Sequence, residues 1–277
     1  MRNIVLLGAG LLALLLGPAR SPAQQPDSSA HPARPAAPGA YRLRTVVLDA
    51  GHGGKDKGCA GPDGAREAAV ALKIVLELGR LIEEEMPEVK VVYTRKTDVF
   101  VELADRAGIA NKHSADLFIS VHCNAGPAAA RGTEVWTMGA HKTEANLAVA
   151  KRENAVILQE DNYKERYAGF DPSSPQSHIL FSLYQSAHID NSLRFAAKVD
   201  HEFRTSVGRP SRGVKQAGFL VLWKSTMPSA LIEVGFLTNP GEEQYLNDKA
   251  GQSYMASGIY RAFRKYKQDL EASSAAD

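Results

Sequence analysis

The sequence predicts a single α/β domain in which a mixed, mostly parallel sheet carries helices on both faces. Short β-branched runs alternate with segments whose apolar residues recur at helical spacing, and 44% of the 277 residues are hydrophobic, as in ordinary folded proteins. Several predicted strands also run into polar or glycine-rich sequence. Because ligands of open α/β sheets bind at the carboxyl ends of the strands, we expect the chemistry at that edge.

The first 23 residues are predicted to be a secretory signal peptide. A short positively charged start precedes an apolar run of 13 residues at 4–16, and small residues at Ser21 and Ala23 suit cleavage. Thirteen helical residues at about 1.5 Å each are too short for a hydrocarbon core of roughly 30 Å, which disfavours the alternative of an uncleaved membrane anchor. We therefore expect a secreted, periplasmic chain with no membrane span after cleavage.

Residues 24–40 hold four prolines and almost no large apolar group, which predicts a disordered linker. The folded domain is expected at 41–270, followed by a flexible tail at 271–277. About 230 residues can bury close to three quarters of their unfolded surface, enough for one core.

Within the domain, strands and helices alternate. Strands are predicted at 43–49, 89–94, 116–122, 132–138, 219–223 and 230–234. Helices are predicted at 66–85 (ended by Pro87), 102–113, about 190–206 and 252–268.

Charge and cysteine content exclude two classes of protein. The formal net charge is +2 without a long basic run, so electrostatic nucleic-acid binding is not expected. Arg2 and Arg20 are the only charged residues of the signal segment, so the chain from Gln24 has 31 basic and 31 acidic residues. Two cysteines are too few for a disulfide-framed scaffold.

Polar chemistry follows three of the predicted strands. His52 and His122 stand at two strand ends, Glu67 opens the first long helix, and Glu233 lies near the end of a third strand. Two imidazoles and one carboxylate with an open fourth position form a usual ligand set of catalytic zinc. Glu233 could then take a proton from an activated water.

Other interpretations of the same residues remain open from spacing alone. Either histidine could be a hydrogen-bonded structural residue, and Glu67 could simply favour the helix N-terminus electrostatically. No His-x-x-x-His pair places two imidazoles on one helix face.

Six sequence segments, taken in their order along the chain, distinguish between these interpretations. They are DAGHGGKD from Asp49, Glu67, TRKTD from Thr94 with LADR from Leu103, ADLFISVHCN from Ala115, RGVK from Arg212, and PSALIEVGFLTN from Pro228. Together they closely resemble the zinc-dependent N-acetylmuramoyl-L-alanine amidases of the amidase-3 family, and the resemblance covers 43 to about 268.

The resemblance implies an amidase-3 type α/β domain that hydrolyses peptidoglycan between the lactyl group of N-acetylmuramic acid and L-alanine, in cell separation or wall remodelling. By matching motif positions, His52, Glu67 and His122 would bind Zn²⁺ and Glu233 would be the catalytic carboxylate. A zinc peptidase acting on the stem peptide and an inactive wall-binding module are the alternatives.

Two features depart from many relatives. Cys59 and Cys123 stand where small residues are common; the alternation of a strand points Cys123 away from His122. Export favours a disulfide between these cysteines over two buried thiols.

The second departure is a long connection at about 140–190, which resembles the regulatory insertion of division-associated amidases. There a helix covers the zinc site until an activator protein displaces it. A helix at 143–160 could bring Glu153 to the open metal position as an autoinhibitory ligand; a solvated Glu153 is the alternative. The segments 179–183 and 190–206 could dock the activator, and we expect His141, His178, His188 and His201 to be surface residues.

Overall fold

The computed structural model describes residues 41–182 and 188–276. The predicted signal peptide and linker lie outside the described residues. Among the residues that are described, no helix is long and apolar enough to cross a membrane.

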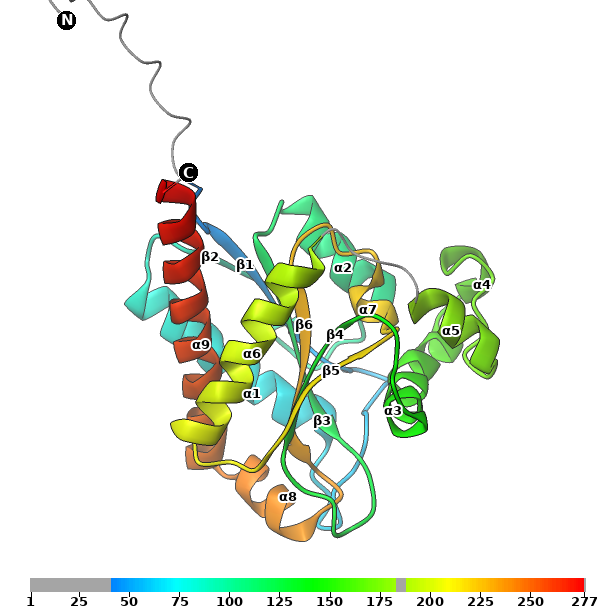
Figure 1. Ribbon diagram of the computed structural model, residues 1–277. Coiled ribbons are helices and arrows are strands. Elements are labelled where there is room, and N and C mark those ends of the chain that lie inside the picture. Colours follow the sequence, from blue (N-terminus) through cyan, green and yellow to red (C-terminus); the bar gives the residue numbers. More distant parts are fainter. Residues whose placement is uncertain (1–40, 183–187, 277) are drawn as a thin grey trace, which may run out of the picture. The chain divides into compact units, whose positions relative to one another are not determined.

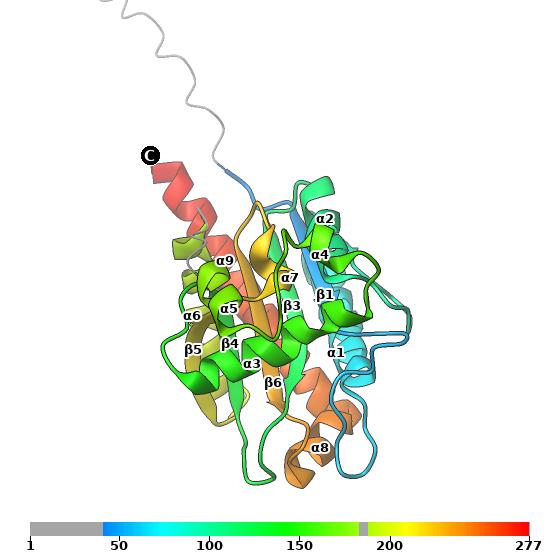
Figure 2. The same ribbon diagram turned by 90° about the vertical axis from the view of Figure 1, so that its right-hand side faces the viewer.

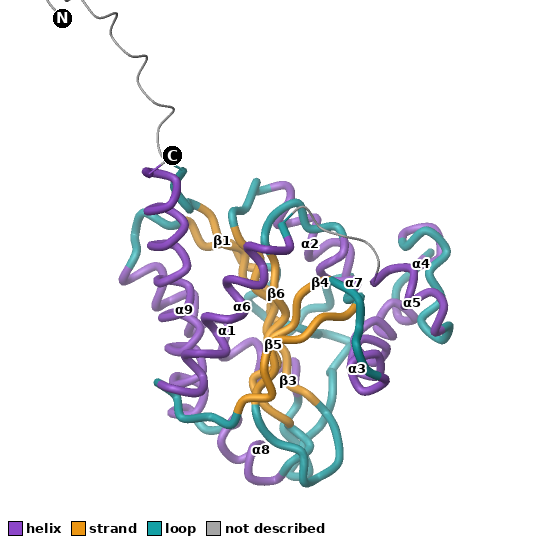
Figure 3. Tube along the Cα trace, viewed as in Figure 1, coloured by secondary structure: helices purple, strands orange, loops and turns teal. Residues whose placement is uncertain are grey.

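A six-stranded sheet forms the centre of the domain (Figures 1 and 3). Its order is β2-β1-β3-β6-β4-β5, in which β1, β2, β3 and β6 are parallel and β4 runs antiparallel to β6. The strands are β1 (Thr45–Ala50), β2 (Lys90–Tyr93), β3 (Leu117–Asn124), β4 (Thr133–Met138), β5 (Ser211–Ala217) and β6 (Ser229–Phe236). The predicted mixed, mostly parallel sheet is confirmed.

Helices cover both faces of this sheet, as predicted. One face carries α1 (Glu67–Glu85), α6 (Ile189–Thr205) and α9 (Lys249–Ala276), with α8 (Pro240–Asn247) beside α9. The other carries α2 (Leu103–Lys112), α3 (Glu144–Asn154), the 3₁₀ helix η1 (Ala155–Gln159), α4 (Tyr163–Arg166), α5 (Pro175–Ser182) and α7 (Leu220–Trp223). Figure 2 shows α3 crossing in front of the sheet.

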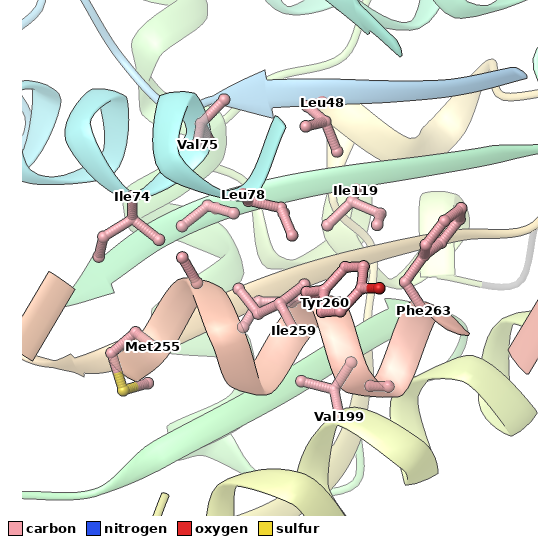
Figure 4. Close-up of a cluster of buried hydrophobic side chains, with 14 of the residues drawn as sticks. Leu48, Ile74, Val75, Leu78, Ile119, Val199, Met255, Ile259, Tyr260 and Phe263 are labelled. Atoms are coloured by element: carbon pink, nitrogen blue, oxygen red, sulfur yellow. The ribbon is translucent and has the colours of Figure 1, made fainter. Parts of the chain in front are cut away.

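Each face has its own hydrophobic core because successive strand residues point to opposite sides. On β1, Leu48 packs with α1 and α9 (Figure 4), whereas Val47 packs under α2 and α7. A sheet buried on both faces requires apolar residues at consecutive strand positions, which explains the short continuous apolar runs that predicted these strands.

Three predictions about the elements were wrong. Residues 219–223 are not a strand, because Leu220–Trp223 form one helical turn; a buried apolar run of five does not distinguish the two. β5 was missed because it is a charged edge strand, as is usual where an edge must avoid pairing with other chains. The tail is helical through Ala276, since α9 continues past residue 270.

An ion-pair cluster joins α6 to α9 and gives a first testable prediction. Glu202, whose side chain is 2% exposed, accepts hydrogen bonds from Arg261 (2.8 Å) and Lys265 (2.9 Å). Burial raises the pKa of Glu202, but the bonds to Arg261 and its neighbours outweigh burial and lower that pKa to about 2.

Because the folded-state pKa is depressed, this stabilisation is present above about pH 4.5 and is lost as the pH falls towards 2. We expect Glu202→Gln to lower the free energy of unfolding by about 1–2 kcal/mol at pH 7, and less at pH 3. Denaturant unfolding at both pH values, with the exposed Glu84→Gln as control, measures this. An equal loss at both pH values would contradict the assignment.

Candidate metal centre

Four buried side chains converge at the carboxyl edge of the sheet. His52 follows β1, His122 lies near the end of β3, Glu67 is the first residue of α1, and Glu153 lies near the end of α3. One possible ligand atom from each residue lies within 4.8 Å of those from the other three. The structure thus brings together the three predicted ligands and the predicted blocking residue.

Glu67 is the central group of this cluster. Its Oε1 lies 3.0 Å from His52 Nε2 and 3.2 Å from His122 Nδ1, and it accepts the backbone N–H of Cys123 (2.9 Å). Its Oε2 accepts the backbone N–H of Cys59 (2.9 Å). Burial raises the pKa of Glu67, but the charge of His52 and the hydrogen bonds to His122 and His52 outweigh burial and hold this pKa well below its ordinary value.

His52 is fixed by its neighbours on both sides. Its φ of 60° is in the left-handed region, and its carbonyl accepts a hydrogen bond from Arg106 Nη2 (2.8 Å). Its Nδ1 donates to Asp56 (2.7 Å), which directs Nε2 at Glu67 and Glu153. A carboxylate behind a histidine is a usual outer partner of a metal-binding imidazole.

Two glycines permit the close packing. A Cβ on Gly51 would lie 2.5 Å from the His122 ring, and one on Gly58 would lie 2.6 Å from Glu67 Oε2. Gly58 also has a φ of +63°. Larger residues at either position would push the ligands apart.

Other residues of the motifs do not contact the cluster, but their hydrogen bonds hold the elements that carry it in place. Asp49 is fully buried and accepts hydrogen bonds from Thr94 (2.6 Å), Ser120 (2.6 Å) and Arg106 (2.8 Å). This network joins β1, β3, α2 and the residue that follows β2, and it positions the loop that carries His52.

The donor set fits a divalent cation. Glu153 Oε2 lies 3.1 Å from His122 Nδ1 and 3.4 Å from His52 Nε2. Yet the buried atoms His52 Nε2 and Glu153 Oε2 have no hydrogen-bond partner, although charge-bearing atoms surround them. Two carboxylates and two imidazoles converge on one point, and such a ligand set can hold a divalent cation such as zinc.

Protons compete with a metal for these atoms. Burial lowers the pKa of His122, but Glu153 and Glu67 outweigh it and raise that pKa to about 9. Metal affinity should therefore weaken as the pH falls, because binding must displace the proton.

Glu233 lies beside this cluster on the adjacent strand. It pairs in register with His122 across β3 and β6, and its side chain is fully buried. Burial, together with the charge of Glu153, raises the pKa of Glu233 well above its ordinary value. Its Oε2 has no hydrogen-bond partner, and its Oε1 lies 3.5 Å from Arg152 Nη2.

A cavity of about 270 Å³ opens beside the cluster. Its lining includes His52, Glu67, Arg152 and Glu153, so α3 forms one wall. A larger cavity of about 750 Å³ lies between α6 and α9, on the opposite face of the sheet from α3, and contains none of these ligands.

The cysteines and one histidine differ from expectation. Cys59 and Cys123 are free thiols, and Cys59 Sγ donates to the Cys123 carbonyl (3.4 Å), so the predicted disulfide is absent. Cys123 does point away from His122, into the core under α1 and α9. His178 was expected at the surface, but it is buried and bonds to the Pro172 carbonyl (3.0 Å).

Sequence reasoning missed two residues of the site. Asp56 stands four positions after His52, and that spacing could have indicated its role. Arg152 directly precedes Glu153. Its contact Glu233 lies 81 residues away in the chain, so no local sequence pattern could have identified this pair.

Comparisons with known proteins agree on one family. The family described as Amidase_3, N-acetylmuramoyl-L-alanine amidase, matches residues 46–265. The N-acetylmuramoyl-L-alanine amidase AmiA of Escherichia coli is 34% identical over 269 residues, which cover 94% of this chain and 90% of AmiA.

Solved structures share the fold. An N-acetylmuramoyl-L-alanine amidase from Clostridium difficile 630 aligns with a TM-score of 0.61 and 28% identity, over 82% of this chain and 97% of that one. The amidase AmiC2 of Nostoc punctiforme aligns with a TM-score of 0.56 and 28% identity, over 82% and 98% of the two chains.

The cluster predicts which histidines bind metal. We expect His52→Ala and His122→Ala to lose most bound zinc, because each removes a ligand, while the exposed His201→Ala retains it. Elemental analysis of the purified variants, with circular dichroism to confirm folding, measures this. Full zinc occupancy in a folded His122→Ala variant would exclude His122 as a ligand.

Proposed function

The chain belongs to the Amidase_3 family of N-acetylmuramoyl-L-alanine amidases, and we propose that it uses zinc to hydrolyse the amide between the N-acetylmuramic acid lactyl group and L-alanine in peptidoglycan. The observation that carries this proposal is the convergence of His52, Glu67 and His122 beside the buried carboxylate of Glu233.

His52, Glu67 and His122 would hold the zinc ion, and Asp56 would fix the imidazole of His52 from behind. When bound, zinc supplies Lewis-acid activation of water at neutral pH. Hydrogen bonds hold these ligands rigidly; for example, the backbone N–H groups of Cys59 and Cys123 both donate to the carboxylate of Glu67.

Glu233 is the proposed general base and acid. It lies within β6, in register with His122 of β3, and burial favours its uptake of a proton. It would accept a proton from the attacking water and pass it to the nitrogen of the departing amine.

In the arrangement described here α3 covers this machinery, and we propose that the chain is autoinhibited. Glu153 approaches both histidines, where it would fill the open metal position. Two side chains that follow Glu153 hold the segment: Asn154 bonds to Gly218 and Leu220 near α7, and Glu160 accepts the N–H of Leu103 on α2 (2.8 Å).

Substrate access would require α3 to move, which fits control by a protein activator. Leu158 and Leu180, both in this insertion, are exposed and offer apolar surface for such a partner. We place the activity in cell separation or wall remodelling in the periplasm, because the substrate is the wall and the N-terminal sequence predicts export.

Loss of Glu233 should separate chemistry from metal binding. We expect Glu233→Gln to retain zinc and to lower turnover about 10²–10⁴-fold, because proton transfer is impaired. Release of peptides with N-terminal L-alanine from purified peptidoglycan measures the reaction and distinguishes an amidase from a stem-peptide peptidase. Glu84→Gln is the exposed control. Near-wild-type turnover by Glu233→Gln would remove this residue from the mechanism.

Loss of Glu153 should activate the full chain. We expect Glu153→Ala to raise basal hydrolysis at least about tenfold, since removing one blocking ligand worth about 1.4 kcal/mol shifts the equilibrium by that factor. The exposed Glu144→Gln on α3 should have no effect. Unchanged or lower activity in a folded, zinc-loaded Glu153→Ala chain would count against autoinhibition.

A point variant is a better test than removal of residues 143–185. That segment contributes Val156, Ile157, Tyr167 and Phe170 to the core beneath α2 and α7. Its deletion would expose this core as well as the site, so activity and folding would change together.

A further inference from the structure

Arg152 fills a small site made only of hydrogen-bond acceptors. Its guanidinium donates to the Ala125 carbonyl (3.1 Å) and to Asn124 Oδ1 (3.0 Å), and it lies 3.5 Å from Glu233 Oε1. Its Nε donates to Glu153 (3.0 Å). A carbonyl, an amide oxygen and a carboxylate therefore face one cation, directly beside the metal ligands.

The orientation of Asn124 is fixed from outside this site. Its Nδ2 donates to the buried carboxylate of Glu134 (2.9 Å), and its own Oδ1 also accepts the N–H of Ala125 (2.8 Å). A rotated side chain would place Oδ1 against Glu134, where two acceptors repel each other. The amide oxygen must therefore face the site.

Glu134 is held in turn by the RGVK segment. Arg212 Nε (2.7 Å) and Lys215 Nζ (2.6 Å) both donate to Glu134 Oε1, so two cationic side chains hold this carboxyl group in place. These residues do not touch the metal ligands. Their contribution is to direct the acceptor of Asn124 inwards.

Amide hydrolysis produces the ligand that such a site binds. The C–N bond breaks as the water oxygen joins the carbonyl carbon, and both water protons end on nitrogen, giving a carboxylate and an ammonium group. The nitrogen changes from one N–H to three N–H donors with a positive charge. Three acceptors, one of them the proposed proton donor Glu233, match that product.

On the basis of the proposed amidase activity, we propose that Asn124 Oδ1, the Ala125 carbonyl and Glu233 bind the departing amine, and that Arg152 occupies this site as an internal mimic of the product. The helix α3 thus blocks two places with adjacent residues: Glu153 the metal position, and Arg152 the leaving-group position. Asn124 contacts the substrate nitrogen, whereas Glu134, Arg212 and Lys215 are positioning residues.

A binding experiment tests the proposal without requiring turnover. The probe is L-alanine amide, whose α-amine is mostly protonated at pH 7, and the matched control is N-acetyl-L-alanine amide, which lacks the charge. Affinities are measured by NMR titration of the full, zinc-loaded chain. Zinc content and thermal melting confirm that each variant is intact.

We expect Arg152→Ala to bind L-alanine amide about tenfold more tightly than the parent chain, and to bind the acetylated probe no better. Adding Asn124→Ala to Arg152→Ala should remove about tenfold of that affinity, because one charge-assisted hydrogen bond is lost. Adding Asn111→Ala, which removes an asparagine on α2 that bonds to Lys224 and Thr226 and not to the site residues, should not.

Arg152→Lys supplies a second comparison. Unlike Asn124→Ala, it changes no residue of the strand β3. Its ammonium should keep the site filled, so that the amine binds weakly as in the parent. An intact Arg152→Ala chain that binds both probes equally would overturn the proposal, and so would equal amine affinity with Lys and Ala at this position. Peptidoglycan hydrolysis in the same preparations separates this failure from failure of the amidase assignment.

Discussion

The carboxylate of Glu67 is the contact on which the site depends. It binds the backbone of the loop before α1 and the backbone of β3, and it touches both imidazoles. A negative charge at the first turn of a helix is favoured by the helix dipole, so the position that stabilises α1 also aims the carboxylate at the sheet edge. The function and the local fold therefore share one residue, and a substitution there would disturb both.

Charge balance explains why α3 can lie over this edge. Glu67, Glu153 and Glu233 bring three buried carboxylates together, and burying them without compensation would be very costly. A divalent cation among the four ligands would balance Glu67 and Glu153, and the cation of Arg152 lies beside Glu233 and Glu153. The covering helix brings one negative and one positive side chain, Glu153 and Arg152, so it adds no net charge to this buried site.

Most of the fold could be predicted from sequence because strands buried on both faces leave continuous apolar runs and helices leave periodic ones. Prediction failed where those signals are weak. The edge strand β5 is mostly polar, and residues 219–223 are a continuous apolar run that suits either a strand or a helical turn. The metal-ligand candidates were recognisable because strand ends and a helix start carry them. Arg152, in contrast, acquires its role only when α3 docks on β3 and β6, a tertiary contact without a local pattern.

The adjacency of Arg152 and Glu153 has a mechanical consequence. Successive residues of an α-helix point about 100° apart, so the neighbours Arg152 and Glu153 reach different targets. Here one target is the histidine pair and the other is the acceptor group at Asn124 and Glu233. Because both side chains belong to one turn, a displacement of α3 that removes one removes the other. A partner that moves this single turn would therefore open the metal position and the leaving-group position in one step.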